Sequence, residues 1–280
     1  MDSAKKTIVK MLIVAIFLIK LFIVHQTSYA QELGTTEFSK KYNEYKLSFE
    51  VYNSSHAEYI LARENYLKFR TLTSQTNAQT ATKKMLRDRD EVLIDYYEAL
   101  RERINETKGI SDDRKNELMQ RLTDEKNWLS EHQTRVSQAG TLSELEDISD
   151  EARDRYVELE GFLYRSLYNI SEGKINDFRS RLIVIFEDVK SKVEQIKGER
   201  REEYVFSDQK IETMERWISE TEARIARSEE EQVEAVTSSE RITNSGTFRG
   251  SIKELEDVRK LLQDASIFVK EIIREIKIAE

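Results

Sequence analysis

The feature that most constrains this chain is the absence of proline from its 280 residues. At average usage a chain of this length would contain about fourteen prolines. Proline removes a backbone hydrogen-bond donor and clashes with the preceding helical turn, so a chain without it has nothing of this kind to interrupt long helices. Charged residues make up 35% of the chain, and many are the helix-favouring Glu, Lys and Arg. We therefore expect an all-α protein.

The apolar residues recur at steps of three and four, which places them on one face of a helix. This spacing predicts about seven helices, in an elongated up-and-down bundle or a chain of antiparallel coiled-coil-like helical hairpins. The first helix is expected to cover about 37 residues, from about Thr36 to Leu72, with a turn in the polar stretch 73–77. The last helix has the most regular stripe, formed by Leu255, Val258, Leu262, Ala265, Val269, Ile272 and Ile276.

Glycines and capping residues suggest where the helices end. Seven of the eight glycines lie at predicted helix boundaries, where a residue without a Cβ can end a helix, and Gly161 alone is expected inside one. Gly173, for example, is predicted to separate the fourth helix from the fifth. Capping boxes at Thr141 and Ser251, each with Glu three residues later, predict helix starts.

These signals predict five segments. They are a secretory signal peptide over 1–30, an N-terminal helical unit of three helices over 31–140, a second helical unit over 141–227, a loop over 228–250, and a C-terminal amphipathic helix over 251–280 that packs on the bundle. The loop is predicted because SSERITNSGTFRG has no apolar period. Residues 93–109 and 182–198 also match at an offset of 89, as a tandem repeat or as two unrelated helices in phase.

The N-terminus predicts export. Three lysines precede an apolar run from Met11 to Val24, and Ser28 and Ala30 fit a cleavage site before Gln31. The alternative is a retained anchor, but the run is shorter than the ~20 apolar residues that span a bilayer. We expect an extracellular, periplasmic or cell-surface protein with no membrane contact after signal cleavage.

Charge and composition bear on the chemistry. Removing residues 1–30 leaves 41 basic and 52 acidic side chains, a net charge of -11, which disfavours nucleic acid or an anionic membrane surface as the main partner. The chain has no cysteine, and His56 and His132 are the histidines left after cleavage. Because no catalytic or metal-binding motif accompanies them, we expect no cofactor, no metal and no enzymatic activity. A carboxylate-based hydrolase is the enzymatic alternative. Both histidines fall on predicted helix seams, where a hydrogen-bonded structural role is expected.

Residues 42–69, YNEYKLSFEVYNSSHAEYILARENYLKF, carry a ring at almost every third or fourth position. The rings form two columns with a 3.5-residue period, which favours a helix-helix seam over a surface that stacks on sugars or bases. Tyrosine hydroxyls suit a partly wet interface, and the change to arginine at Arg63 and Arg70 indicates that the seam opens to solvent there. The candidate interaction or seam residues are Tyr42, Tyr45, Phe49, Tyr52, His56, Tyr59, Arg63, Tyr66 and Phe69.

The sequence thus predicts an exported, non-enzymatic helical protein of the cell envelope or exterior, with a structural or protein-protein interaction role. Its helices would bind another protein or a second copy of the chain. The alternative is a chaperone-like or ligand-binding helical module, in which an aromatic groove around Tyr45 to Phe69 takes extended peptides or glycans.

Overall fold

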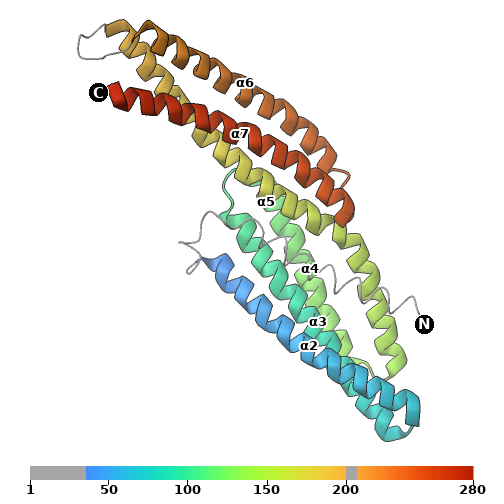
Figure 1. Ribbon diagram of the computed structural model, residues 1–280. Coiled ribbons are helices and arrows are strands. Elements are labelled where there is room, and N and C mark those ends of the chain that lie inside the picture. Colours follow the sequence, from blue (N-terminus) through green and yellow to red (C-terminus); the bar gives the residue numbers. More distant parts are fainter. Residues whose placement is uncertain (1–35, 200–206, 280) are drawn as a thin grey trace. The chain divides into compact units, whose positions relative to one another are not determined.

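The computed structural model describes residues 36–199 and 207–279, which form six helices and contain no strand (Figure 1). The helices are α2 (Glu37–Phe69), α3 (Leu72–Glu106), α4 (Asp112–Gln138), α5 (Leu142–Glu199), α6 (Asp208–Ser239) and α7 (Ser245–Ala279). The predicted all-α class is confirmed, and adjacent helices pack as in a bundle. The predicted signal peptide lies outside the described residues. None of the described helices is long and apolar enough to cross a membrane.

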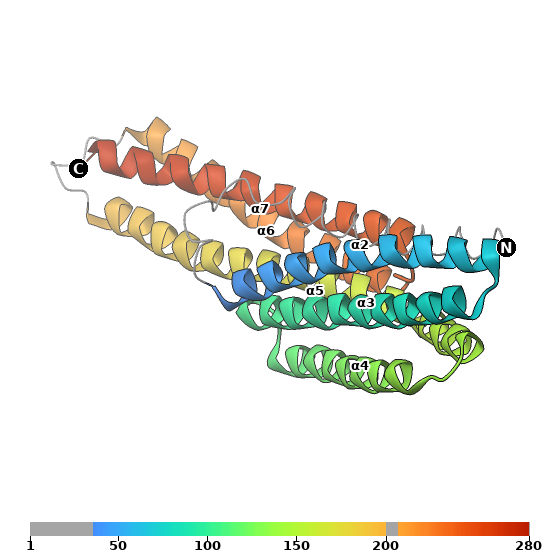
Figure 2. The ribbon, with the colours of Figure 1, turned by 90° about the horizontal axis from the view of Figure 1, so that it is seen from below.

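The described chain divides into two compact units. The first unit holds α2, α3, α4 from Asn116 and the start of α5 up to Tyr156, and its four segments run up and down (Figures 1 and 2). The second unit holds residues 107–115, the rest of α5, α6 and α7. The predicted units were 31–140 and 141–227, whereas α5 contributes to both compact units. Because α5 is unbroken at Tyr156, where the first unit ends, no helix end in the sequence marks this boundary.

The first predicted turn is displaced. The stretch 73–77 is helical, and the chain reverses at Arg70 and Thr71 instead. Arg70 has a φ of 50° and its N–H donates to the Tyr66 carbonyl over 2.9 Å, which closes α2. The Ser74 N–H donates to the Thr71 hydroxyl over 3.1 Å, which opens α3. A polar stretch on the solvent side of a helix does not break it, and hydroxyl capping decides where the helix begins.

The fourth and fifth predicted helices are one helix, α5, so the described chain has six helices where about seven were expected. Gly173 lies inside α5 and does not end it. A Cβ at this position would lie 2.5 Å from Cγ1 of Ile110 and 2.9 Å from Cγ2 of Thr107. Gly173 therefore lets the α3–α4 turn pack directly on α5. This need for close approach is the reason for the glycine.

The loop predicted over 228–250 is also wrong, because α6 continues to Ser239 and α7 begins at Ser245. Small and polar residues form the buried face of α6 here, and the apolar period is lost although the helix continues. These buried residues are Ser228, Gln232 and Ala235. The break covers only residues 240–244, where the Asn244 side chain accepts from the backbone N–H groups of Gly246 and Thr247 and so caps α7. The capping box predicted at Ser251 lies within α7.

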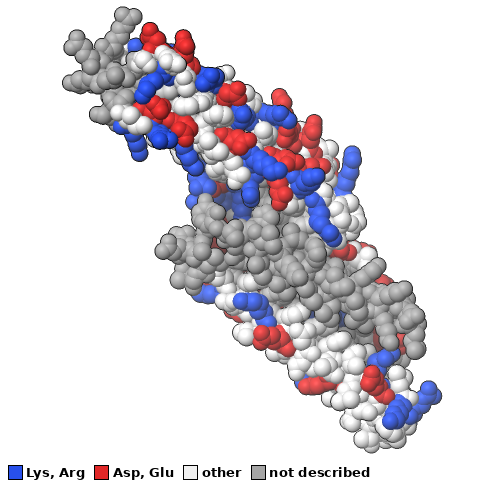
Figure 3. Space-filling view, viewed as in Figure 1, with Lys and Arg blue, Asp and Glu red and all other residues white. Residues whose placement is uncertain are grey.

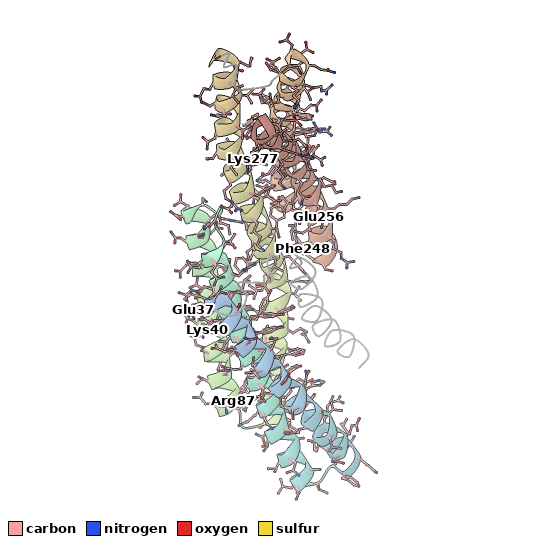
Figure 4. All side chains as sticks on the ribbon, turned by 60° about the vertical axis from the view of Figure 1, so that its left-hand side comes forward. Glu37, Lys40, Arg87, Phe248, Glu256 and Lys277 are labelled. Atoms are coloured by element: carbon pink, nitrogen blue, oxygen red, sulfur yellow. The ribbon has the colours of Figure 1, made fainter. Side chains whose placement is uncertain are left out.

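The core of the second unit has the pattern expected from the sequence. Every member of the predicted α7 stripe from Leu255 to Ile276 is buried. Phe248, labelled in Figure 4, lies at the start of α7. Its ring stacks on that of Tyr164 of α5 with ring centroids 5.0 Å apart. A Cβ on Gly161 would lie 3.1 Å from the Ile242 carbonyl oxygen. This glycine therefore allows the α6–α7 turn to pack closely on α5, as Gly173 does for the α3–α4 turn.

Replacing Gly109 with Ala is expected to lower the free energy of unfolding by about 2 to 4 kcal/mol. Gly109 has a φ of +61°, and an added Cβ would lie 2.1 Å from the Gly173 carbonyl oxygen. Urea unfolding followed by circular dichroism measures the loss. The matched control is Gly198→Ala, also a glycine of the second unit, because no heavy atom lies within 4 Å of a Cβ there. Equal unfolding midpoints for the two variants would contradict the close approach.

Candidate functional site

The predicted site lies on α2, whose ends are well defined. The Thr36 side chain accepts from the Ser39 N–H over 3.2 Å and caps the helix. Glu37 in the first turn and Lys68 in the last turn each complement the helix dipole. Figure 4 marks the first turn by Glu37 and Lys40. The helix is therefore held at both ends by local interactions, and its rings are set at fixed positions along it.

The rings of α2 form a continuous ladder along the helix. Each ring contacts the next at a spacing of three or four residues, with centroids between 5.7 and 6.5 Å apart. These separations fall in the range where aromatic pairs attract each other. The ladder consists of Phe38, Tyr42, Tyr45, Phe49, Tyr52, His56 and Tyr59.

The first half of the ladder packs against α3. The Tyr45 side chain is 3% exposed, and its ring lies 5.5 Å from that of Tyr96 on α3. Phe38 and Tyr52 are also buried. At the start of the seam the Arg103 guanidinium of α3 lies 4.8 Å from the Phe38 ring centroid, a favourable cation–π geometry. This part of α2 is a helix-helix seam.

Burial decreases toward the end of α2, as the change from rings to arginines indicates. Tyr59, Arg63 and Tyr66 are half-buried, and Phe69 and Arg70 are exposed. The second column is half-buried from its start, at Tyr42, Phe49 and His56. The structure thus divides the nine candidate residues into Tyr45 and Tyr52, which are buried, Phe69, which is exposed, and six with one side in contact with solvent.

The ladder is uncharged at neutral pH. Burial raises the pKa of the Tyr45 hydroxyl, and it raises the pKa of Tyr52 against a weaker opposing effect of the Arg89 charge. Desolvation lowers the pKa of His56, because removing water from around the ring disfavours its charged form. The half-buried edge of α2 therefore presents polarisable rings and hydroxyl groups without a formal charge, apart from Arg63.

The opposite side of α2 carries aliphatic residues that the sequence analysis did not single out. Leu47, Val51 and Leu61 are 63%, 54% and 62% exposed. At 3.6 residues per turn Leu47 and Leu61 lie on the side of the helix opposite Tyr45 and Tyr52, and Val51 lies at the margin of that side, about 100° from Tyr52. We call these three residues the outer strip. Sequence reasoning missed them because the rings dominated the period, although the apolar residues outside both ring columns were a readable signal.

The outer strip belongs to a wider concentration of exposed apolar side chains. Half of the large hydrophobic side chains exposed in the described chain fall between residues 47 and 72, so their exposure is a local property of the α2–α3 hairpin. They are Leu47, Val51, Ile60, Leu61, Leu67, Phe69 and Leu72.

A second cluster, inside the first unit, contains His132, which lies on a seam as predicted. The His132 and Asp90 side chains are both 0% exposed, with Nδ1 and Oδ2 2.5 Å apart. Nε2 lies 3.0 Å from the Ile148 carbonyl of α5. A carbonyl can only accept, so Nε2 carries a hydrogen, and the bond to Asp90 requires a second hydrogen between Nδ1 and Oδ2. Both ring nitrogens are thus occupied in joining α3, α4 and α5.

Aromatic and charged groups surround this pair. The Trp128 ring stacks on His132 at 5.1 Å, and the Arg155 guanidinium lies 4.7 Å from the Trp128 ring. Arg155 also donates over 2.7 Å to Glu125, a buried carboxylate that Arg121 contacts at 3.0 Å. The cluster is a structural polar network of the kind that stabilises only when its members are paired. The sequence signal for it was Asp90, an acid at a core-facing position of α3.

Other described side chains do not assemble a metal site: in residues 36–199 and 207–279 no group of three or more His, Asp or Glu side chains is placed to hold an ion. Figure 3 shows Lys and Arg interspersed with Asp and Glu on the visible face of α6 and α7, so that face has no patch of one charge.

The described chain is therefore an all-α protein with bundle-like helix packing, distinguished by a helix that is aromatic on its covered side and aliphatic on its open side. No protein-family model, no curated protein and no solved structure matches it. The residues of α2 themselves are the basis for a functional proposal.

Proposed function

We propose that this chain is an exported, non-enzymatic interaction protein of the cell envelope or exterior, which binds another protein or a second copy of itself along the outer strip of α2. The export proposal rests on the lysines, apolar run and small residues of the N-terminus. The observation that carries the interaction proposal is the exposure of Leu47, Val51 and Leu61 on the open side of α2.

The outer strip has the geometry of a helix-binding surface. Leu47 and Leu61 are fourteen residues apart, which at 1.5 Å per residue is about 21 Å along the helix. Aliphatic anchors at such spacings are those that a partner helix covers in helix-in-groove recognition. Burying one such side chain contributes about 1.5 to 3 kcal/mol.

The half-buried edge of the ring ladder supports the second candidate, a chaperone-like or ligand-binding module. Tyr42, Phe49, Tyr59 and Tyr66 are each half-buried, and partly accessible rings can stack on a peptide or a glycan. The burial of Tyr45 and Tyr52 removes two rings from that groove. For this reason the outer strip is the preferred interaction surface.

The double variant Leu47→Glu with Leu61→Glu is expected to weaken association at least tenfold, because a partner that covers the strip would bury two unpaired carboxylates. Its melting temperature should change little, because exposed positions contribute little to folding. Sedimentation velocity measures self-association. A photo-crosslinking residue at exposed Ser54 reports a different partner.

The matched control is Val184→Glu with Val233→Glu, which places the same charges at two exposed valines of the second unit. Association that survives the α2 variant, or that the control weakens equally, would contradict the outer strip as the binding surface. Loss of peptide or glycan binding in Tyr42→Ala with Tyr66→Ala, at unchanged melting, would favour the aromatic groove.

A further inference from the structure

The turn between α2 and α3 exposes apolar side chains at the end of the hairpin. We call residues 65–77 the hairpin tip. Within it, Leu67 and Phe69 are 49% and 58% exposed, and Leu72 is 79% exposed, the highest value for a large hydrophobic residue in the described chain. The Gln79 side chain donates to the Gly140 carbonyl over 2.7 Å, so the α4–α5 turn ends level with Gln79. The tip projects beyond that turn (Figure 1).

The tip also lies in a stretch of the chain that contains no acidic residue. No Asp or Glu occurs from Asn65 to Arg87, although the whole chain has a net charge of -8. Lys68 and Arg70 lie in the tip itself, and the first turn of α3 contains no acidic residue. In Figure 3 residues other than Lys, Arg, Asp and Glu make up most of the visible face at the end that carries this turn. The tip thus combines exposed apolar groups with local positive charge.

The next two cations along α3 form contacts with residues outside the tip. Lys84 pairs with Glu58 over 2.7 Å, and Lys83 donates to the Ser137 carbonyl over 2.9 Å. The nearest acids in sequence are Glu64 on α2 and Asp88 on α3. The Glu144 carboxylate, in the first turn of α5, lies at the α4–α5 turn, where it accepts from the Gly140 N–H. The positive charge of the tip therefore comes from Lys68 and Arg70.

Arg70 occupies a conformation that favours glycine. Its φ of 50° makes it the one non-glycine residue with positive φ in the part of the chain that the structure describes. A side chain in this region is strained by contact between Cβ and the backbone, which glycine avoids. Such strain is retained where another requirement opposes its removal. Here the residue places a guanidinium at the apex of the turn.

We propose that the hairpin tip binds the surface of a bilayer that contains anionic lipids. Leu67, Phe69 and Leu72 would enter the boundary between headgroups and acyl chains, and the two cations would lie at the lipid phosphates. Each Lys or Arg close to such a surface increases binding about fivefold. The sequence-based expectation of no membrane contact relied on the charge of the whole chain, whereas a surface responds to the charges within about 10 Å of it. This contact uses residues outside the outer strip and does not depend on the proposed protein interaction.

A fluorescent label tests the contact directly, because the full chain has no cysteine and a single one can be introduced. With Thr73→Cys carrying an environment-sensitive dye, vesicles of phosphatidylcholine and phosphatidylglycerol should shift the emission to the blue. High salt should reverse the shift, and vesicles of phosphatidylcholine alone should cause little change. The matched label is Thr134→Cys, an exposed position on α4 of the same unit. It should not respond, even if residues 1–30 attach the chain to the vesicle.

Two further variants separate binding from folding. Arg70→Gly should weaken the vesicle response about fivefold while raising the melting temperature, because it removes a cation and the strain together. Phe69→Ser with Leu72→Ser should weaken it well over tenfold, because two apolar side chains no longer enter the bilayer. The proposal is overturned if neither label responds, if both labels respond equally, or if neutral vesicles are as effective as anionic ones. An unchanged response of the more stable Arg70→Gly variant would also overturn it.

Discussion

Replacing His132 with Ala is expected to lower the free energy of unfolding by about 3 to 5 kcal/mol, the range for breaking a buried charged pair. The change leaves the Asp90 carboxylate at 0% exposure without its 2.5 Å partner, and it removes the donor to the Ile148 carbonyl. Arg89, 3.3 Å from the other carboxylate oxygen, is the remaining charged contact of Asp90 in the described chain. Urea unfolding followed by circular dichroism measures the loss.

The control for this variant is Ser130→Ala, an exposed position two residues earlier on the same helix, which should change stability by less than about 0.5 kcal/mol. The double variant Asp90→Ala with His132→Ala should lose less than the sum of the single losses, because it leaves no unpaired carboxylate buried. Additive losses would show that the two side chains act independently, contrary to the geometry of the pair.

Replacing Tyr45 with Ala is expected to lower the free energy of unfolding by about 3 to 5 kcal/mol, as for other large aromatic residues in a core. The side chain is buried against α3, where its ring contacts Tyr96, and its removal would leave a cavity between the two helices. Tyr59→Ala should lose less than about half as much, because Tyr59 is half-buried and its site can fill with water. Thermal and urea unfolding of both variants measure the difference.

Equal losses at Tyr45 and Tyr59 would mean that the seam is closed along its whole length in solution. A conservative Tyr45→Phe variant is the control for packing, since it keeps the ring and removes the hydroxyl. It should retain most of the stability if burial of the ring is the main contribution. A loss as large as that of Tyr45→Ala would instead assign the effect to the hydroxyl group.

Much of the fold follows from local patterns. The lack of proline and the three-four spacing of apolar residues predict the all-α class. The same spacing predicts the buried stripe of α7. The 3.5-residue period of the rings predicts a seam on α2, and the change to arginine predicts the direction in which burial decreases. These predictions succeed because each depends on residues within one helix, where geometry fixes which side chains share a face.

The errors concern residues whose roles depend on distant partners. Gly109 and Gly173 are both predicted helix boundaries. Gly109 does form a turn, whereas Gly173 lies inside α5 and leaves room for that turn to pack against the helix. The small and polar residues of α6 from Ser228 to Ala235 look like a loop because their apolar period is lost, whereas they are the buried face of a helix. Asp90 becomes a core residue only because α4 brings His132 to it.

Helix α2 shows most clearly which features its own residues determine and which depend on tertiary packing. Its residues alone fix a long helix with rings on one side and aliphatic groups on the other, since side-chain direction follows from 3.6 residues per turn. The packing of α3 decides which of the two apolar sides is covered, because burial is a property of the neighbour and not of the local pattern. It is this choice that leaves Leu47, Val51 and Leu61 open to solvent and makes them, more than the rings, the surface offered to a partner.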